Sequence, residues 1–221
     1  EIYTRSLVGS VQMCIRDRFR FLVNLIYGLL IIVNGRLEVI GKENLPDKDT
    51  YVLVAPHRTW LDPVFIAIAT RPREFVIMAK EELFNVPIFG WIIKKIGAFP
   101  VNRDKPGPSV IKTPVKALKE SDRALMIFPT GTRHSTELKG GATTIAKLSK
   151  KPVITAVYDG PRTIKDLLKR KKTRVIFGQG FEVQRRVEGV SDLDQYYMDK
   201  MQASFDQLDQ ELKDRASHSE S

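Results

Sequence analysis

The chain has 221 residues, of which 43% are hydrophobic and 28% charged, a balance that excludes wholesale disorder and collagen-like or coiled-coil classes. Its 36 lysines and arginines against 26 aspartates and glutamates give a net charge of +10 at pH 7, which predicts an acidic partner: nucleic acid, anionic lipid, a phosphorylated substrate or an acidic carrier protein. The single cysteine excludes an internal disulfide and a cysteine-rich metal site.

The first eighteen residues, EIYTRSLVGSVQMCIRDR, contain neither an initiator methionine nor an apolar period. Read back into codons, residues 7–11 and 13–17 resemble a transposon-type sequencing adapter. We therefore interpret residues 1–18 as a non-native leader of translated adapter, the alternative being a native extension. The segment contributes only +1 to the net charge, so the basic character of the chain does not depend on it.

Residues 19–34 begin with a nearly continuous apolar run, FRFLVNLIYGLLIIV. A membrane-spanning helix needs about twenty residues, and this run is shorter. We therefore predict a helix over residues 19–34 that lies in the membrane interface, the alternative being a buried core helix.

Short apolar segments then alternate with helical stretches between residues 35 and 190. The predicted strands are LEVIG (37–41), YVLVA (51–55), FVIMA (75–79), GAFPV (97–101), ALMIF (124–128), VITAV (153–157) and RVIFG (174–178). The predicted helices span residues 63–69, 88–96, 110–118 with an interruption at Pro114, and 141–149. This alternation predicts an α/β domain over residues 35–190, with a mixed, mostly buried sheet flanked by helices.

The C-terminal part of the chain has a helical period. Apolar residues recur every three or four positions from Leu193 to Leu212, which predicts an amphipathic helix over residues 191–214 that packs on the domain. The polar tail 215–221 is expected to fray.

His57 and Asp62 are the first candidates for chemistry. His57 follows the strand 51–55 through one proline, and Asp62 directly precedes Pro63 at the start of a predicted helix. On one uniform helix the two side chains would point about 140° apart. If His57 lies on a loop and Asp62 is the N-cap, the carboxylate can hold the Nδ1 proton and leave Nε2 as a base for a substrate hydroxyl. The alternative is a plain helix cap beside a structural histidine.

Two further clusters follow predicted strands. In FPTGTR (128–133), with Lys139 beyond it, a glycine-rich turn exposes backbone N–H groups and Arg133 offers a planar fork for phosphate oxygens. The other cluster is GAFPVNR (97–103), which ends at Arg103, with Lys105 beyond it. Each alone can be a turn with a solvated arginine. The sequence has no zinc-ligand spacing and no Walker loop, so neither a metal nor a bound cofactor is predicted.

In this order and with these gaps, HRTWLD (57–62), the block made of residues 80–87 and 90–103, and FPTGTR (128–133) resemble the lysophosphatidic acid (1-acyl-sn-glycerol-3-phosphate) acyltransferase family of bacterial type. The resemblance covers residues 35–161. Two positions depart from the family pattern: Thr130 stands where the family has glutamate, and Thr155 where it has proline. Loss of the glutamate bears on how the acceptor's glycerol or Arg133 is oriented.

The resemblance implies transfer of a fatty acyl group from a thioester to the sn-2 hydroxyl of 1-acylglycerol 3-phosphate, which makes phosphatidic acid. His57 and Asp62 would be the catalytic pair. The implied phosphate-binding residues are Arg103, Gly131, Thr132 and Arg133, with Lys105, Thr130 and Lys139 in support. Acyl carrier protein or coenzyme A would carry the acyl group as co-substrate.

The expected partners are therefore lysophosphatidic acid, the acyl donor and an anionic membrane surface, and the expected location is the cytoplasmic face of the cell membrane, as a monotopic or peripheral protein. Nucleic acid is not expected, because the apolar run suits lipid and no basic stripe is interleaved with aromatics. The basic run 169–172 is interpreted as a solvated turn or, at a membrane, a headgroup contact. Two alternatives stay open: an acyltransferase for another lysophospholipid or glycerol 3-phosphate, and a non-catalytic basic lipid-binding protein.

Overall fold

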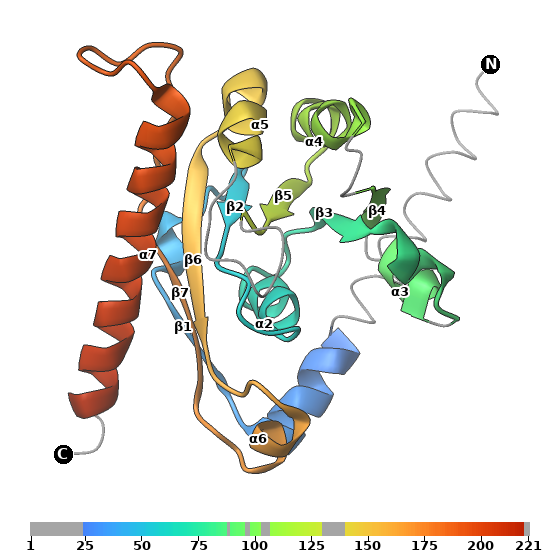
Figure 1. Ribbon diagram of the computed structural model, residues 1–221. Coiled ribbons are helices and arrows are strands. Elements are labelled where there is room, and N and C mark those ends of the chain that lie inside the picture. Colours follow the sequence, from blue (N-terminus) through green and yellow to red (C-terminus); the bar gives the residue numbers. More distant parts are fainter. Residues whose placement is uncertain (1–23, 88, 96–97, 103–106, 130–139, 219–221) are drawn as a thin grey trace.

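The computed structural model describes residues 24–87, 89–95, 98–102, 107–129 and 140–218. Its centre is a seven-stranded sheet in the order β1-β7-β6-β2-β5-β3-β4 (Figure 1). The strands are β1 (Leu37–Ile40), β2 (Val52–Val54), β3 (Phe75–Lys80), β4 (Ala98–Val101), β5 (Ala124–Ile127), β6 (Val153–Asp159) and β7 (Thr173–Phe177). All seven lie where the sequence predicts them, with ends that differ by one or two residues.

The sheet is mixed, as predicted. Strands β6, β2, β5, β3 and β4 run parallel to one another. Strand β7 pairs antiparallel with β6, and β1 closes the sheet parallel to β7. Because the carboxyl ends of parallel strands meet at one edge of a sheet, the chain leaves β2, β5 and β4 on the same side.

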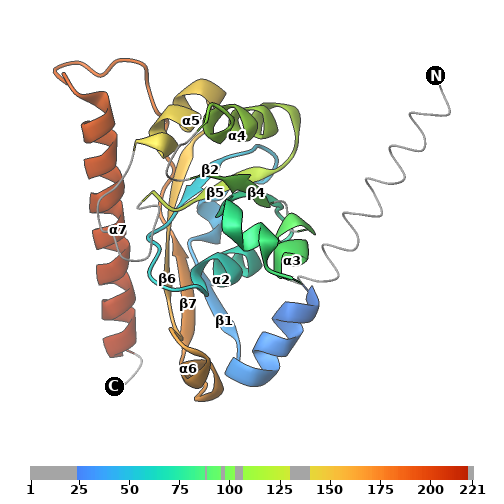
Figure 2. The same ribbon diagram turned by 45° about the vertical axis from the view of Figure 1, so that its right-hand side comes forward.

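Helices cover both faces of the sheet (Figures 1 and 2). They are α2 (Asp62–Ala69), α3 (Phe89–Lys95), α4 (Ser109–Glu120), α5 (Gly141–Ser149), α6 (Ile164–Leu168) and α7 (Leu193–His218), with short 3₁₀ turns η1 (Lys42–Asn44) and η2 (Glu81–Asn85). Helix α2 lies on one face, whereas α4, α5 and α7 lie on the other.

Strand β2 lies in the middle of the core. Its three residues are completely buried: Leu53 belongs to the apolar cluster on the α2 face, and Val52 and Val54 belong to the cluster on the opposite face. Burying side chains of this size stabilises a fold by about 1.5–3 kcal/mol each. The loop that leaves β2 therefore starts from a rigid position.

Helix α4 corrects one expectation. The sequence predicts an interruption at Pro114, but α4 is continuous from Ser109 to Glu120 with Pro114 buried inside it. A proline removes one N–H from the helical ladder. The remaining bonds of α4 and the burial of the ring hold the helix together across this position.

Helices α6 and α7 add to the expected pattern. Helix α6 was not predicted, although Thr163 and Asp166 form a capping box at its start, a spacing that can be found in the sequence. Helix α7 is present as predicted but extends to His218, into the segment expected to fray. An ion pair of 2.9 Å between Arg215 and Glu211, one turn apart, supports this extension.

Of the apolar segment predicted as a helix, residues 24–34 are helical, and we call them the N-terminal helix. Residues 1–23, with the suspected leader, lie outside the described residues. Leu30 packs against the cluster on the α2 face, whereas Leu25, Leu29 and Ile32 are 48%, 54% and 69% exposed. Within the described ranges, no helix is both long and apolar enough to cross a membrane.

Candidate active site

The loop after β2 carries His57 to the carboxyl edge of the parallel strands. The N–H of Ala55 donates to the carbonyl of Ile127 (3.3 Å), which keeps the chain beside β5. The ring of His57 then contacts the ring of Phe128, the residue after β5, with centroids 4.5 Å apart and planes inclined by 33°. The first and third sequence blocks thus meet through these two rings.

Asp62 is placed differently from the N-cap that the sequence predicts. Helix α2 begins at Asp62 itself, and Leu61 is the N-cap. The carboxylate turns back to the preceding loop, where its Oδ2 accepts hydrogen bonds from the backbone N–H groups of Arg58 (2.6 Å) and Thr59 (2.7 Å). These charge-assisted bonds offset the cost of burying the carboxylate. Its second oxygen, Oδ1, is buried without a hydrogen-bond partner among the described residues.

The structure brings the predicted pair together. Nδ1 of His57 lies 3.4 Å from Oδ2 of Asp62, at the long end of the hydrogen-bond range. The carboxylate side chain is 1% exposed, whereas the imidazole is 18% exposed and therefore open to a reactant. With Nδ1 facing the carboxylate, Nε2 lies on the other side of the ring. Such a pair can remove a proton from a hydroxyl group and stabilise the imidazolium that forms.

Arg58 connects this loop to the C-terminal helix. Its Nη1 donates to Oδ1 of Asp209 (2.7 Å), and its Nη2 pairs with Oδ2 of the same carboxylate. The hydrogen bonds that Arg58 donates to Asp209 raise the pKa of Arg58. Sequence reasoning missed this contact because the two residues are 151 positions apart and belong to no common motif.

Tyr158, near the end of β6, belongs to the buried cluster on the α2 face, near Asp62. Its ring stacks on Phe65 at 5.0 Å, and its hydroxyl donates to the carbonyl of Pro161 (2.9 Å). Burial, and then the nearby charges of Asp62 and Asp159, raise the pKa of Tyr158. The phenol therefore stays protonated and keeps its donated hydrogen bond.

Thr155, where the resemblance leads one to expect proline, is completely buried in β6. Its Oγ1 lies 2.6 Å from the Oγ of Ser204 in α7, so a hydroxyl pair joins the central strand to the helix. A proline would lack this hydroxyl. The hydroxyl of Thr155 therefore contributes to the packing of α7 on the sheet.

The predicted phosphate-binding residues are not described by the structure. Arg103, Gly131, Thr132 and Arg133, and the supporting Lys105, Thr130 and Lys139, lie outside the described residues. The described parts that precede them are Asn102, just after β4, and Pro129, just after β5. In the described part of the chain, no three His, Cys, Asp or Glu side chains gather as a metal site would require.

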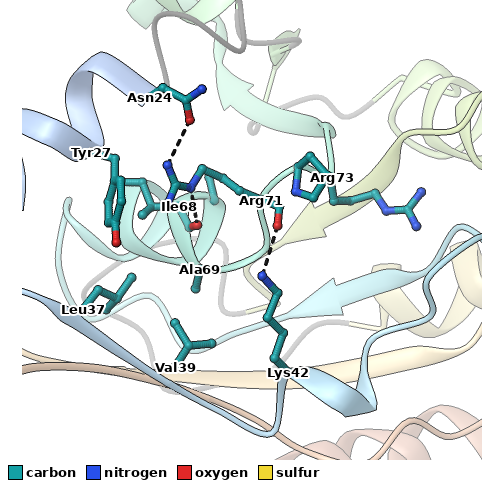
Figure 3. A pocket seen from close by; sticks show the side chains of 11 residues that line it. Asn24, Tyr27, Leu37, Val39, Lys42, Ile68, Ala69, Arg71 and Arg73 are labelled. Atoms are coloured by element: carbon teal, nitrogen blue, oxygen red, sulfur yellow. Dashed lines mark hydrogen bonds between the residues drawn. The ribbon is translucent and has the colours of Figure 1, made fainter.

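A pocket of about 490 Å³ lies at the other end of α2, between that end, β1 and the N-terminal helix (Figure 3). Arg71 donates to Asn24 Oδ1 (2.9 Å) and lies 3.6 Å from the centre of the Tyr27 ring, while Lys42 donates to the carbonyl of Arg71 (3.1 Å). His57 does not line this pocket. The charged groups of Arg71 and Lys42 already bind other residues of the pocket. We therefore interpret the pocket as the junction that attaches the N-terminal helix to the domain.

Comparison with known proteins decides the family. The acyltransferase family model matches residues 36–159, more than half of the chain. A 1-acyl-sn-glycerol-3-phosphate acyltransferase from Streptococcus pneumoniae is 42% identical over 200 residues, which cover 88% of this chain and 74% of that protein. The chain belongs to the 1-acyl-sn-glycerol-3-phosphate acyltransferase family. The resemblance inferred from the three sequence blocks is thereby confirmed.

Two further comparisons support the placement of this acyltransferase. A Bacillus subtilis protein of the same name is 42% identical over 153 residues, 68% of this chain and 76% of its own. The crystal structure of the 1-acyl-sn-glycerophosphate (LPA) acyltransferase PlsC from Thermotoga maritima superimposes with a TM-score of 0.63, at 18% identity over 88% of this chain and 79% of that chain. At this identity the structural likeness supports the fold alone.

Proposed function

We propose that this enzyme transfers a fatty acyl group from a thioester to the sn-2 hydroxyl of 1-acylglycerol 3-phosphate and so makes phosphatidic acid for phospholipid synthesis. The observation that carries the proposal is the buried carboxylate of Asp62 directed at Nδ1 of His57. The names of the Streptococcus pneumoniae and Bacillus subtilis relatives support the choice of acceptor.

In the proposed reaction, Nε2 of His57 accepts the proton of the sn-2 hydroxyl while the hydroxyl oxygen attacks the thioester carbonyl carbon. The tetrahedral intermediate collapses with cleavage of the carbon–sulfur bond. The imidazolium then returns its proton to the thiolate, which leaves as the free thiol. Asp62 stabilises the imidazolium during these steps and keeps the ring oriented. No acyl-enzyme is needed.

The acceptor's phosphate is proposed to bind Arg103, Arg133 and the backbone N–H groups of Gly131 and Thr132, with Lys105, Thr130 and Lys139 near them. Two described features support this assignment. The segments with these residues follow β4 and β5, whose carboxyl ends share an edge with that of β2. The ring contact between Phe128 and His57 also keeps the start of the third block beside the base. Binding the phosphate would position the hydroxyl and lower the barrier by orientation.

The acyl donor is proposed to be acyl carrier protein or coenzyme A, which are both acidic carriers and suit a chain with a net charge of +10. The N-terminal helix is proposed to lie in the interface of the membrane, where a lysolipid acceptor resides, on the cytoplasmic face. Its exposed Leu25, Leu29 and Ile32 recur at helical spacing and support this role. No bound cofactor or metal takes part in the proposed chemistry.

The test is formation of phosphatidic acid from lysophosphatidate by the full chain, with acyl carrier protein thioester and acyl coenzyme A assayed separately. His57→Ala should lower kcat by at least about a hundredfold while circular dichroism stays unchanged. His218→Ala, at the end of α7, is the matched histidine control and should keep full activity. If folded wild-type protein is inactive with both donors, or if His57→Ala is fully active, the proposed reaction or base is wrong.

A further inference from the structure

Helix α6 exposes a second apolar face outside the catalytic machinery. The side chain of Leu167 packs against the cluster on the α2 face. Ile164 and Leu168, one turn apart, are instead 61% and 66% exposed, among the most exposed large apolar residues of the described chain. The capping box between Thr163 and Asp166 holds this short helix in place. The two apolar side chains are therefore presented from a defined helix.

Cations surround these two side chains. The segment 162–172 contains six lysines and arginines and one acidic residue, Asp166. Lys165, Lys169 and Lys171 are exposed there. We call Ile164 and Leu168 together with these three lysines the α6 surface.

The acidic groups near the α6 surface already have hydrogen-bond or ion-pair partners within the protein, and the cations outnumber them. Asp166 accepts the hydroxyl and N–H of Thr163. Glu38, on neighbouring β1, binds Arg174 (3.1 Å) and Lys172 (3.8 Å). The surface as a whole is therefore both apolar and positively charged.

The α6 surface is continuous with the N-terminal helix. Nη2 of Arg170, in the turn after α6, donates to the carbonyl of Ile32 (2.9 Å). Asn34 Nδ2 donates to Oγ1 of Thr173 (2.5 Å) at the start of β7. Figures 1 and 2 show α6 and the N-terminal helix together at one end of the molecule, away from α4 and α5.

We propose that the α6 surface is a second membrane contact, which binds an anionic bilayer beside the N-terminal helix. Ile164 and Leu168 would enter the boundary between headgroups and acyl chains, and the lysines would bind lipid phosphates. Membrane binding strengthens with the buried apolar area and with electrostatic attraction to anionic lipids, so a second apolar and cationic contact beside the N-terminal helix would strengthen it. The proposal extends the proposed function, whose acceptor is a lipid, but vesicle binding tests it without any turnover.

The experiment measures co-sedimentation of the full chain with vesicles of phosphatidylcholine alone or mixed with phosphatidylglycerol. Wild-type protein should prefer the anionic vesicles, and added salt should weaken that preference. The double variant Ile164→Ser/Leu168→Ser should lower partitioning by about tenfold, and Lys169→Gln/Lys171→Gln by a similar factor, on anionic vesicles only. Both variants should keep wild-type turnover on detergent-dispersed lysophosphatidate, because neither touches the catalytic pair.

The matched controls are Leu148→Ser, whose side chain is 50% exposed on α5, and Lys112→Gln/Lys119→Gln on α4. Both controls should bind vesicles like the wild type. Undiminished partitioning of the α6 variants, or an equal loss in the controls, would overturn the inference. It would also fail if Ile164→Ser/Leu168→Ser abolished self-association in sedimentation velocity while leaving vesicle binding intact, because the surface would then bind a second copy. If binding follows the expected pattern but the wild type makes no phosphatidic acid, only the proposed reaction fails.

Discussion

Arg58 joins Asp62 and Asp209, since its backbone N–H donates to the Asp62 carboxylate and its guanidinium binds the carboxylate on α7. One residue thereby holds the loop that carries His57 against a helix from the end of the chain. We regard Arg58 as a positioning residue, because the loop geometry depends on it and no reacting atom needs to touch it.

The Arg58–Asp209 pair should therefore contribute to both stability and catalysis. We expect Arg58→Lys to lower kcat/KM by about tenfold, because an ammonium group cannot span both carboxylate oxygens. In a double-mutant cycle with Asp209→Asn, urea unfolding should give a coupling of about 1 kcal/mol, as for a partly exposed pair. The Glu211–Arg215 pair on the same helix is the control, and its variants should leave kcat/KM unchanged. A kcat/KM unaffected by Arg58→Lys would contradict the positioning role.

Asp62→Asn should reduce kcat by about a hundredfold or more and change KM much less, because a neutral amide stabilises the imidazolium poorly. The amide oxygen can still accept the N–H bonds of Arg58 and Thr59, so the fold should persist. Steady-state kinetics with lysophosphatidate measure the effect. Asp47→Asn, on the connection between β1 and β2, is the control. Equal kcat values for Asp62→Asn and the wild type would exclude Asp62 from catalysis.

Gly178→Ala should destabilise the protein by about 1–3 kcal/mol through overpacking. A Cβ at Gly178 would lie 2.3 Å from Oγ1 of Thr155 and 3.2 Å from Oγ of Ser204, the hydroxyl pair that joins β6 to α7. Gly141→Ala is the control, because a Cβ there meets nothing within 4 Å and alanine favours the helix. Thermal and urea unfolding report both changes. Equal stability of the two variants would show that β6 and α7 can separate at little cost.

Arg133→Lys should raise KM for lysophosphatidate by about tenfold with kcat nearly unchanged, since a point charge replaces a planar fork. The comparison needs saturating acyl donor, so that only acceptor binding limits the rate. Collapse of kcat with an unchanged KM would instead indicate a role in the chemical step. The same assay with Lys139→Gln tests whether the supporting cation contributes to acceptor binding.

Much of the fold could be predicted because its strands are short and apolar, and the central ones, such as β2 and β7, are fully buried. The strand at Val52–Val54 and the six other strands of the sheet follow directly from that pattern. The spacing of His57 and Asp62 allowed a contact through a loop and a helix start, and the resemblance of the three sequence blocks to the family favoured that contact over a plain helix cap. Pro114 shows the limit of such rules, since burial in the packed α4 outweighed the local preference of proline.

Other features required the folded chain. The order of the strands is set by pairing between distant segments, and no local pattern encodes that β1 lies beside β7. The contacts of Arg58 with Asp209 and of Thr155 with Ser204 join residues that are far apart in sequence. Sequence alone thus determined the seven strands, the family and the candidate pair of His57 and Asp62, because these depend on periodicity, on ordered motifs and on short-range spacing. Only the tertiary structure decided that α7 supports the loop of His57 and that α6 lies beside the N-terminal helix, because packing of distant surfaces establishes both relationships.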